Sequence, residues 1–469
     1  MSLSQKRGMK ASDPSNPLWK KLHRFASCLI GRSGQELVLP DACAAPSQYP
    51  PEWLVAAADG SDPQWVPASG QIEQEHLCAH KLSLTYSRGI VAPGEIQVLA
   101  AEEGIPRMIR VADLDPECST VVARKVVLPS FNTITSVASS PLESDYFQLK
   151  EEVRLDAATG YLLGVAAGNG SCPRKESLSV ADVCGDLAKE TERCVHRFFV
   201  DPSKQPTMRT VSRIGKIGSP AVEHIWYSQA LARFMEDQVG RGAESKHLPP
   251  TFWAASRAFH LVLFAGLMAT DGCFWYDKGK LQMSYSTSSL RLAREILILC
   301  MLLEVRANLS ANDHRTKRTP GLREYSVVFS PGTFCRIAPF IELHKPSKQN
   351  LLLANNRAAP FRDGVPFPRT LAPGLADLVP SMLQRGYVWA AARKGQVQRS
   401  RALGWVNLLE SAGDLSEEGA RWRRIVTDTS VTWEALHGTE PSEDLKWWPR
   451  GGNPGTFLTT NGYLFTALD

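Results

Sequence analysis

Two nine-residue segments of this chain end in polar side chains that could take part in metal chemistry. The segment LLGVAAGNG (162–170) aligns without gaps with FAGLMATDG (264–272), and both have glycine at the third and ninth positions. The eighth position is Asn169 in the first copy and Asp271 in the second. Two carboxylates held together at such positions would bind divalent cations for the hydrolysis of phosphodiester bonds.

The small residues of the two copies predict how these side chains are brought together. The second copy lies in an apolar run far shorter than the roughly 20 residues of a membrane-spanning helix. Small residues on one helix face instead allow two helix backbones to approach closely. They are Gly164, Ala167 and Gly168 in the first copy and Gly266, Ala269 and Thr270 in the second. We expect a left-handed glycine cap to end each helix and to deliver Asn169 and Asp271 to the same end of the pair.

The elements that follow each copy repeat in the same order. After the second copy the pattern predicts a hairpin turning at Asp277–Gly279 and a serine-capped amphipathic helix over 288–305. Strands over 306–312 and 323–330 and a closing helix over 333–344 follow. The same order, αββαββα, recurs more loosely after the first copy. A duplicated half with a shared helical seam has pseudo-twofold symmetry, so we expect a monomer.

Residues from about 155 to 345 resemble the LAGLIDADG (dodecapeptide, DOD-type) homing endonucleases of the kind embedded in inteins. The two motif copies carry the resemblance, together with SKHLPPTFWAASRAF before the second copy, which is similar to a lysine-containing block of that family. The resemblance implies that Asp271 and the residue at the place of Asn169 are ligands of Mg²⁺. It also implies that Lys246 supports catalysis and that double-stranded DNA is the substrate.

The asparagine departs from the family pattern, in which both positions are acidic. An amide is a neutral and weaker ligand than a carboxylate for a hard cation. We therefore expect DNA binding with impaired cleavage, or nicking of one strand. Two alternatives stay open: a non-catalytic DNA- or RNA-binding protein on the same scaffold, and two helix ends capped by Asp271 and Asn169 without chemistry.

DNA contacts are expected from the outward faces of the two sheets, which could enter the major groove. The candidates are basic residues in or beside the predicted strands, and each is alternatively a solvated surface charge. They are Arg209, Arg213, Lys216, Arg306, Arg315, Lys317, Arg318 and Arg323. The run DHRTKRT (313–319) is the strongest group, because it forms a basic loop beside strands.

The segments on either side of this region are strand-like. Short β-branched runs occupy 78–124, and strand signals return near the end of the sequence. Both resemble the halves of an intein splicing (Hint) domain, which implies a nucleophile near Cys28 and cyclisation at the last residue, Asp469. The sequence ends in Leu468-Asp469 where that family has His-Asn, and its block histidine is absent at 93–96. We expect a degenerate splicing domain; a self-processing Hint protein and a Cys28 buried in a helix are the alternatives.

The predicted fold class is α+β, with a pseudo-twofold αββαββα endonuclease inserted between the two halves of an all-β Hint-like domain. The expected parts are an N-terminal segment (1–75, with a host-protein remnant to about 27 as one interpretation), a first β part (76–150), the endonuclease (151–345), a linker or helical region (346–420) and a second β part (421–469).

The composition agrees with a soluble globular protein. The chain has 469 residues, of which 43% are hydrophobic and 22% charged, and its net charge of +5 permits a polyanionic partner without requiring one. Ten cysteines without a CxxC pair disfavour both a disulfide scaffold and a structural zinc site. Because the N-terminal sequence is polar and basic, we expect a cytoplasmic protein without a membrane partner.

Overall fold

The structure is a computed structural model, and the described part of the chain falls into two compact units. Unit 1 comprises the described residues up to Lys125 and those from 362 onward, and unit 2 those between Val126 and Phe361. The second unit is therefore longer than the expected 151–345. The described residues are 28–30, 36–38, 52–55, 64–67, 70–73, 78–84, 88–116, 120–125, 134–139, 146–173, 176–182, 185–214, 220–252, 255–277, 280–312, 324–334, 336–354, 364–413, 415–429, 431–442, 447–450, 456–458 and 464–466.

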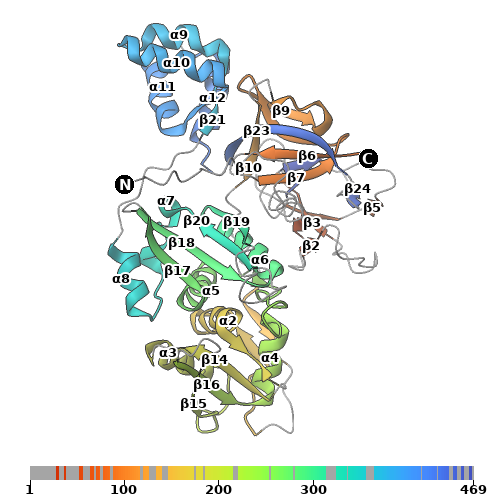
Figure 1. Ribbon diagram of the computed structural model, residues 1–469, viewed down its shortest axis with the longest axis vertical. Coiled ribbons are helices and arrows are strands. Elements are labelled where there is room, and N and C mark those ends of the chain that lie inside the picture. Colours follow the sequence, from red (N-terminus) through yellow and green to blue (C-terminus); the bar gives the residue numbers. More distant parts are fainter. Residues whose placement is uncertain are drawn as a thin grey trace, which may run out of the picture. The chain divides into compact units, whose positions relative to one another are not determined.

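Unit 2 contains the same order of elements twice, which confirms the predicted αββαββα repeat (Figure 1). The first half consists of α2 (Ala157–Asn169), β13 (Gly170–Ser171), β14 (Ser177–Asp182), α3 (Gly185–His196), β15 (Met208–Ile214), β16 (Pro220–Tyr227) and α4 (Gln229–Val239). The second consists of α5 (Arg257–Thr270), β17 (Gly272–Asp277), β18 (Lys280–Thr287), α6 (Leu290–Leu302), β19 (Ala307–Asn312), β20 (Glu324–Phe329) and α7 (Pro331–Phe334). Outside the repeat, β11 (Ser136–Ala138) pairs with β12 (Glu152–Arg154), and α8 (Pro346–Ala354) follows α7.

The two halves have equivalent antiparallel sheets. Their strand orders are β13-β14-β16-β15 and β17-β18-β20-β19, so each element of one half has a counterpart in the other. The predicted hairpin is confirmed, since the β17–β18 pairing closes at Asp277 and Lys280. The serine cap of α6 is confirmed as well, because Ser289 Oγ accepts a hydrogen bond from the Leu292 amide at 3.1 Å.

The predicted closing helix over 333–344 is wrong in extent. Helix α7 ends at Phe334, and a single 3₁₀ turn (Ala338–Phe340) follows. Pro339 lies inside this turn, and proline lacks the amide hydrogen that a continuing α-helix would need.

Helices α2 and α5 cross at their glycines, as the small residues predicted. A Cβ atom on Gly164 would lie 2.2 Å from the carbonyl oxygen of Leu263, and one on Gly266 would lie 2.4 Å from that of Tyr161. A Cβ atom on Gly168 would lie 1.9 Å from Oγ1 of Thr270. Backbone therefore packs against backbone at Gly164 and Gly266, whereas Gly168 packs against the side chain of Thr270.

The expected left-handed glycine caps are wrong. Gly170 is extended, with φ −77° and ψ 151°, and Gly272 is not among the glycines with positive φ. The two glycines instead let the chain pass from helix to strand across the last turn of its own helix. A Cβ atom on Gly170 would lie 2.5 Å from Cα of Ala166, and one on Gly272 would lie 2.4 Å from the carbonyl oxygen of Met268.

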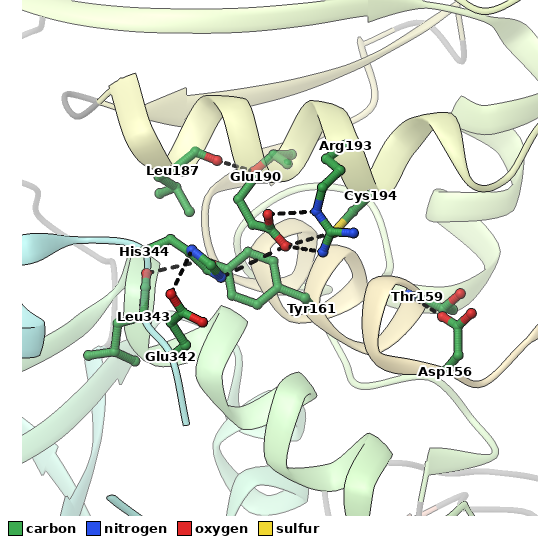
Figure 2. Close-up of polar contacts among 11 residues, drawn as sticks. Asp156, Thr159, Tyr161, Leu187, Glu190, Arg193, Cys194, Glu342, Leu343 and His344 are labelled. Atoms are coloured by element: carbon green, nitrogen blue, oxygen red, sulfur yellow. Dashed lines mark hydrogen bonds and ion pairs between the residues drawn. The ribbon is translucent and has the colours of Figure 1, made fainter. Parts of the chain in front are cut away.

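At the N-terminal end of α2, a polar cluster fastens the segment after α7 to the first half (Figure 2). The Tyr161 hydroxyl donates to the Leu343 carbonyl at 3.1 Å, and the His344 ring packs edge-on against the Tyr161 ring. His344 Nε2 lies 3.8 Å from Glu190 Oε1, and Arg193 Nε donates to the same carboxylate at 2.8 Å. The bond from Arg193 is the main reason that the pKa of Glu190 is lowered.

Unit 1 contains a sheet built from strands that precede unit 2 in the sequence and strands that follow it. Its order is β4-β3-β25-β26-β8-β10-β23-β6-β7, and β9 pairs with β8. The strands that precede unit 2 are β3 (Glu52–Val55), β4 (Gln64–Pro67), β6 (Ala79–Leu84), β7 (Arg88–Pro93), β8 (Gln97–Glu102), β9 (Ile105–Arg110) and β10 (Val121–Lys125). Those that follow it are β23 (Val431–Ser442), β25 (Thr456–Leu458) and β26 (Leu464–Thr466). Separate pairs are formed by β1 (Cys28–Ile30) with β2 (Glu36–Val38) and by β5 (Gly70–Glu73) with β24 (Trp447–Arg450).

The region expected as a linker or helical segment forms a packed helical body within unit 1. It contains β21 (Gly364–Pro366), α9 (Ala372–Leu378), α10 (Met382–Lys394), β22 (Gln396–Gln398), α11 (Arg399–Ser411) and α12 (Glu417–Thr427). Its core is built around Phe367, Trp405 and Trp422 and continues into Val121 and Trp433 of the sheet. None of the helices in the described ranges is long and apolar enough to span a membrane.

The helix seam can be tested by substituting a crossing glycine. Gly164→Ala should lower the free energy of unfolding of unit 2 by at least about 2 kcal/mol, because the methyl group would overlap the α5 backbone. Gly185→Ala is the matched control, since open space surrounds Gly185, and it should change that free energy by less than about 1 kcal/mol. Urea denaturation measures both, and equal effects would contradict the seam.

Candidate active site

The C-terminal ends of α2 and α5 lie together, because close contacts occur in the same order along both helices. Gly160 faces Val262, Gly164 faces Gly266, and Gly168 faces Thr270. Asn169 is the last residue of α2, and Asp271 directly follows α5. Both side chains are half-buried. The structure thus brings the two predicted metal-site residues to one end of the helix pair.

Asn169 is anchored by its own side chain. Its Nδ2 donates a hydrogen bond of 3.0 Å to the carbonyl oxygen of Ala181 on β14. A carboxylate at this position could not donate that bond, so the amide has a structural role here. The amide oxygen is the only atom of this side chain that could serve as a ligand for a cation.

Lys246 lies at the same end of the pair. Its Nζ donates to the carbonyl oxygen of Gly168 in the last turn of α2, and the residue is only 8% exposed. Burial lowers the pKa of Lys246 to about 8, while the nearby charge of Asp271 opposes this shift. The lysine therefore places positive charge beside the carboxylate and at the negative end of the α2 dipole.

A second lysine, which the sequence did not reveal, occupies the corresponding place on α5. Lys348 Nζ donates to the carbonyl oxygens of Met268, Ala269 and Thr270 at 3.0, 3.1 and 2.7 Å. Lys348 comes from α8, 78 residues after Thr270, and no motif marks it. Each helix of the pair thus ends against a lysine side chain.

Tyr285 is the other residue that sequence reasoning missed. It lies opposite Gly272 in the β17–β18 pairing and is 1% exposed. Its hydroxyl has no hydrogen-bond partner in the described part of the chain. Burial and the nearby charge of Asp271 raise the Tyr285 pKa well above its usual value, so the phenol stays protonated as a donor.

The donor set fits a single hydrated Mg²⁺ better than a pair of metal ions. Mg²⁺ keeps several waters and needs only one or two protein oxygens. Asp271 supplies one carboxylate, and Asn169 supplies one amide oxygen. Within the described ranges, no three His, Cys, Asp or Glu side chains are grouped so that they could hold a metal ion.

Of the predicted DNA-contacting residues, the structure describes the side chains of two. Arg209 is exposed on β15, and Arg306 is half-buried directly before β19. The backbone of Arg213 belongs to β15, but its side chain lies outside the described residues. The remaining candidates, Lys216, Arg315, Lys317, Arg318 and Arg323, lie wholly outside them, as does the run 313–319.

The outward face of the second sheet is polar. Cross-strand partners share a face, and the partners of one face are largely small or amide-bearing residues. They include the half-buried Gln282, Ser286 and Asn308 and the buried Ser284 and Ser326, beside an exposed Trp275. The opposite face packs Met283, Tyr285 and Phe329 into the core. Hydroxyl and amide groups of this kind can hydrogen-bond base edges in a groove.

Of the two predicted splicing residues, only the backbone of Cys28 lies in the described part of the chain. The backbone of Cys28 begins strand β1, which corrects the alternative of a helical cysteine, and its side chain lies outside the described part. Asp469 also lies outside it.

Comparison with known proteins finds a family match in the second half of the αββαββα repeat. Residues 258–334 match the family described as a LAGLIDADG-like domain, and this range runs from α5 to α7 and contains Asp271. Among solved structures, the chain is similar to "The homing endonuclease I-WcaI bound to its DNA recognition sequence", with 12% identity, a TM-score of 0.29, and coverage of 41% of this chain and 85% of that chain. No curated protein matches the sequence.

The unpartnered hydroxyl of Tyr285 gives a stability test. Tyr285→Phe should raise the free energy of unfolding by about 1 kcal/mol or more, because it removes a buried polar group without a partner. Tyr161→Phe is the control, and it should lower that free energy by about 1 kcal/mol because the Tyr161 hydroxyl bonds Leu343. Urea denaturation of both variants without added metal measures the difference. Destabilisation by Tyr285→Phe would mean that its hydroxyl has a partner.

Proposed function

We propose that unit 2 is a LAGLIDADG-type homing endonuclease that binds double-stranded DNA and hydrolyses it with Mg²⁺, with activity weakened by Asn169. The observation that carries this proposal is the glycine-packed helix pair, which delivers Asn169 and Asp271 to one end beneath two equivalent sheets. The match of residues 258–334 to a LAGLIDADG-like domain supports it.

Each residue of the proposed site has a separate role. Mg²⁺ held by Asp271 and the amide oxygen of Asn169 would activate water and offset charge on the phosphate. Lys246 and Lys348 supply positive charge at the two helix ends, where a scissile phosphate on either strand would need it. Tyr285 keeps a buried, protonated hydroxyl near the charge of Asp271, and this hydroxyl has no hydrogen-bond partner in the described part of the chain.

Asn169 makes the site asymmetric. Loss of one negative charge weakens cation binding on the side of the first helix, while Asp271 keeps its charge on the other. The proposed outcome is cleavage of one strand in preference to both. The DNA itself would lie on the outward sheet faces, held by Arg209, Arg306 and the polar side chains of the second sheet.

A second candidate function is a non-catalytic nucleic-acid-binding protein on the same scaffold. The observation that favours it is the hydrogen bond from Asn169 Nδ2 to the carbonyl oxygen of Ala181, because this bond gives the Asn169 side chain a structural role that does not involve a metal. Such a protein would bind DNA or RNA through the same sheets and would act as a monomer.

Cleavage of a plasmid separates the two candidates. The wild-type chain is first used, without added metal, to select the duplexes that it binds from a randomised pool. The selected site is then cloned into a supercoiled plasmid. With Mg²⁺ the wild type should give nicked circles, and Asn169→Asp should give linear product at least about 100-fold faster than wild type, because it restores the missing charge.

Asp271→Asn is the control and should give neither product. Linear product at equal rates from wild type and Asn169→Asp would show that the asparagine is tolerated. Binding without cleavage by both would favour the non-catalytic candidate.

We also propose that unit 1 is a degenerate Hint-like splicing domain into which unit 2 is inserted. The support is that β23, β25 and β26 pair with β6, β10, β3 and β8 across the whole of unit 2. The reactive pattern is altered, since Pro93-Gly94-Glu95-Ile96 stands where the block histidine is expected.

Prolonged incubation of the purified chain with a thiol should leave it intact, because the block histidine that activates the scissile amide is absent at 93–96. Mass spectrometry of the whole chain measures this. A thiol-dependent break directly before Cys28 would instead establish a self-processing Hint protein.

A further inference from the structure

Helix α10 buries small side chains and exposes large ones, which is the reverse of an ordinary surface helix. Its buried residues are Val388, Ala391 and Ala392. Met382 is 88% exposed and Leu383 70%, and Tyr387 and Trp389 are also exposed. Exposed apolar and aromatic side chains gathered on one element mark an interaction surface.

The same helix lies in a stretch without negative charge. No Asp or Glu occurs between Asp377 and Glu410, whereas Arg385, Arg393, Lys394, Arg399 and Arg401 lie there. Arg399 is buried and holds four backbone carbonyls, so it belongs to the core. The other four are exposed.

Basic residues elsewhere in the helical body are balanced by carboxylates. Arg369 pairs with Glu103 at 2.8 Å, Arg421 with Glu417 at 2.6 Å and Arg423 with Glu410 at 2.9 Å. No carboxylate in the described ranges forms an ion pair with Arg385, Lys394 or Arg401. The Arg401 guanidinium instead lies over the Tyr387 ring, 4.1 Å from its centroid, and so joins α11 to the α10 surface.

The outward side of α10 has little side-chain bulk at Gly386 and Ala390. At 100° per residue, Met382, Gly386, Ala390 and Arg393 follow one another along the outward side of α10. Nothing lies within 4 Å of a Cβ atom placed on Gly386. A ligand could therefore approach the helix backbone between the aromatic side chains that flank it.

We propose that this surface, the α10 face, binds the backbone of double-stranded DNA outside the segment held by unit 2. The α10 face comprises Arg385, Tyr387, Trp389, Arg393, Lys394 and Arg401. The proposal rests on the proposed function, because it gives the chain a second contact with the same polyanion.

The spacing and chemistry of the α10 face favour DNA over an acidic protein. Arg385 and Lys394 are separated by about 13 Å along the helix axis and lie on opposite flanks of the α10 face, so each would reach a different phosphate of the duplex backbone. The exposed Tyr387 and Trp389 rings beside these cations have a flat apolar surface that can pack against the sugars of the backbone. Sequence-independent contact of this kind would add affinity without reading bases.

The test compares two charge-matched double variants of the full chain. Arg385→Gln with Lys394→Gln removes two cations from the α10 face. Arg421→Gln with Arg423→Gln removes two cations that are already paired with glutamates. The probe is a mixed-sequence duplex of about 50 base pairs, and fluorescence anisotropy measures its dissociation constant over about 0.05 to 0.3 M KCl.

The α10 pair should weaken binding about tenfold near 0.1 M salt and should reduce the slope of log K against log salt by about 2, because two phosphate contacts are lost. The control pair should change affinity less than about twofold and leave the slope nearly unchanged. Circular dichroism melts of both variants confirm equal folding. Trp389→Ala should weaken binding without changing the slope, because it removes contact without charge.

Three results would overturn the inference. Equal losses from the two double variants would mean that only net charge matters. Unchanged binding by the α10 variant, while Arg209→Gln weakens binding, would place all DNA contacts on unit 2 and leave the proposed function standing; the α10 face would then fit an acidic protein. Absence of DNA binding by the wild type would remove the proposed function as well.

Discussion

The close approach of α2 and α5 is the constraint on which the rest of unit 2 depends. Gly164 and Gly266 bring two helix backbones into direct contact, and larger side chains there would separate them. The separation would act on everything attached to the helix ends. Lys246 reaches a carbonyl of α2 from a loop between the halves, and Lys348 reaches three carbonyls of α5 from beyond the second half. The two sheets are then fixed on either side of the pair, because each begins directly after one of these helices. A seam made of glycine thus sets the positions of the acid, the amide, the lysines and both sheets at once.

The repeat could be predicted from the sequence because its signals are local. Alternating apolar residues marked β19 and β20, Ser289 marked the start of α6, and two aligned segments marked the seam. Contacts between residues that are distant in the sequence gave no such local signal. Lys348 and Tyr285 join the site from distant elements, and neither has a neighbour in the sequence that announces it. The predicted glycine caps were wrong for a related reason. Glycine is needed at Gly170 and Gly272 because a Cβ atom there would clash with the last turn of the preceding helix. The rule for helix caps considers only the backbone conformation of the glycine and does not include such a clash. Pro339, by contrast, was a local signal that ended α7 early.

The two ends of α2 show how one helix serves two purposes. Near its N-terminal end, Tyr161 bonds Leu343, and Glu190 of α3 contacts His344, so both contacts join the first half to the segment after the second (Figure 2). Its C-terminal end carries Asn169 and touches Lys246. Polar contacts thus hold α2 near its N-terminal end, whereas the residues of the candidate site lie at its C-terminal end.

The sheet of unit 1 has a consequence for the way the chain folds. The Lys81 and Glu440 side chains pair across β6 and β23 although 359 residues separate them in sequence. Bringing such distant strands together carries a large loop-closure entropy, and contacts of this kind slow folding. A folded unit 2 shortens that loop, since it replaces more than 200 freely moving residues with one compact body between Lys125 and Gly364. On the ribosome, β6 to β10 emerge long before β23 exists. These early strands must therefore wait, with exposed pairing edges, until the inserted unit has folded and the last strands arrive.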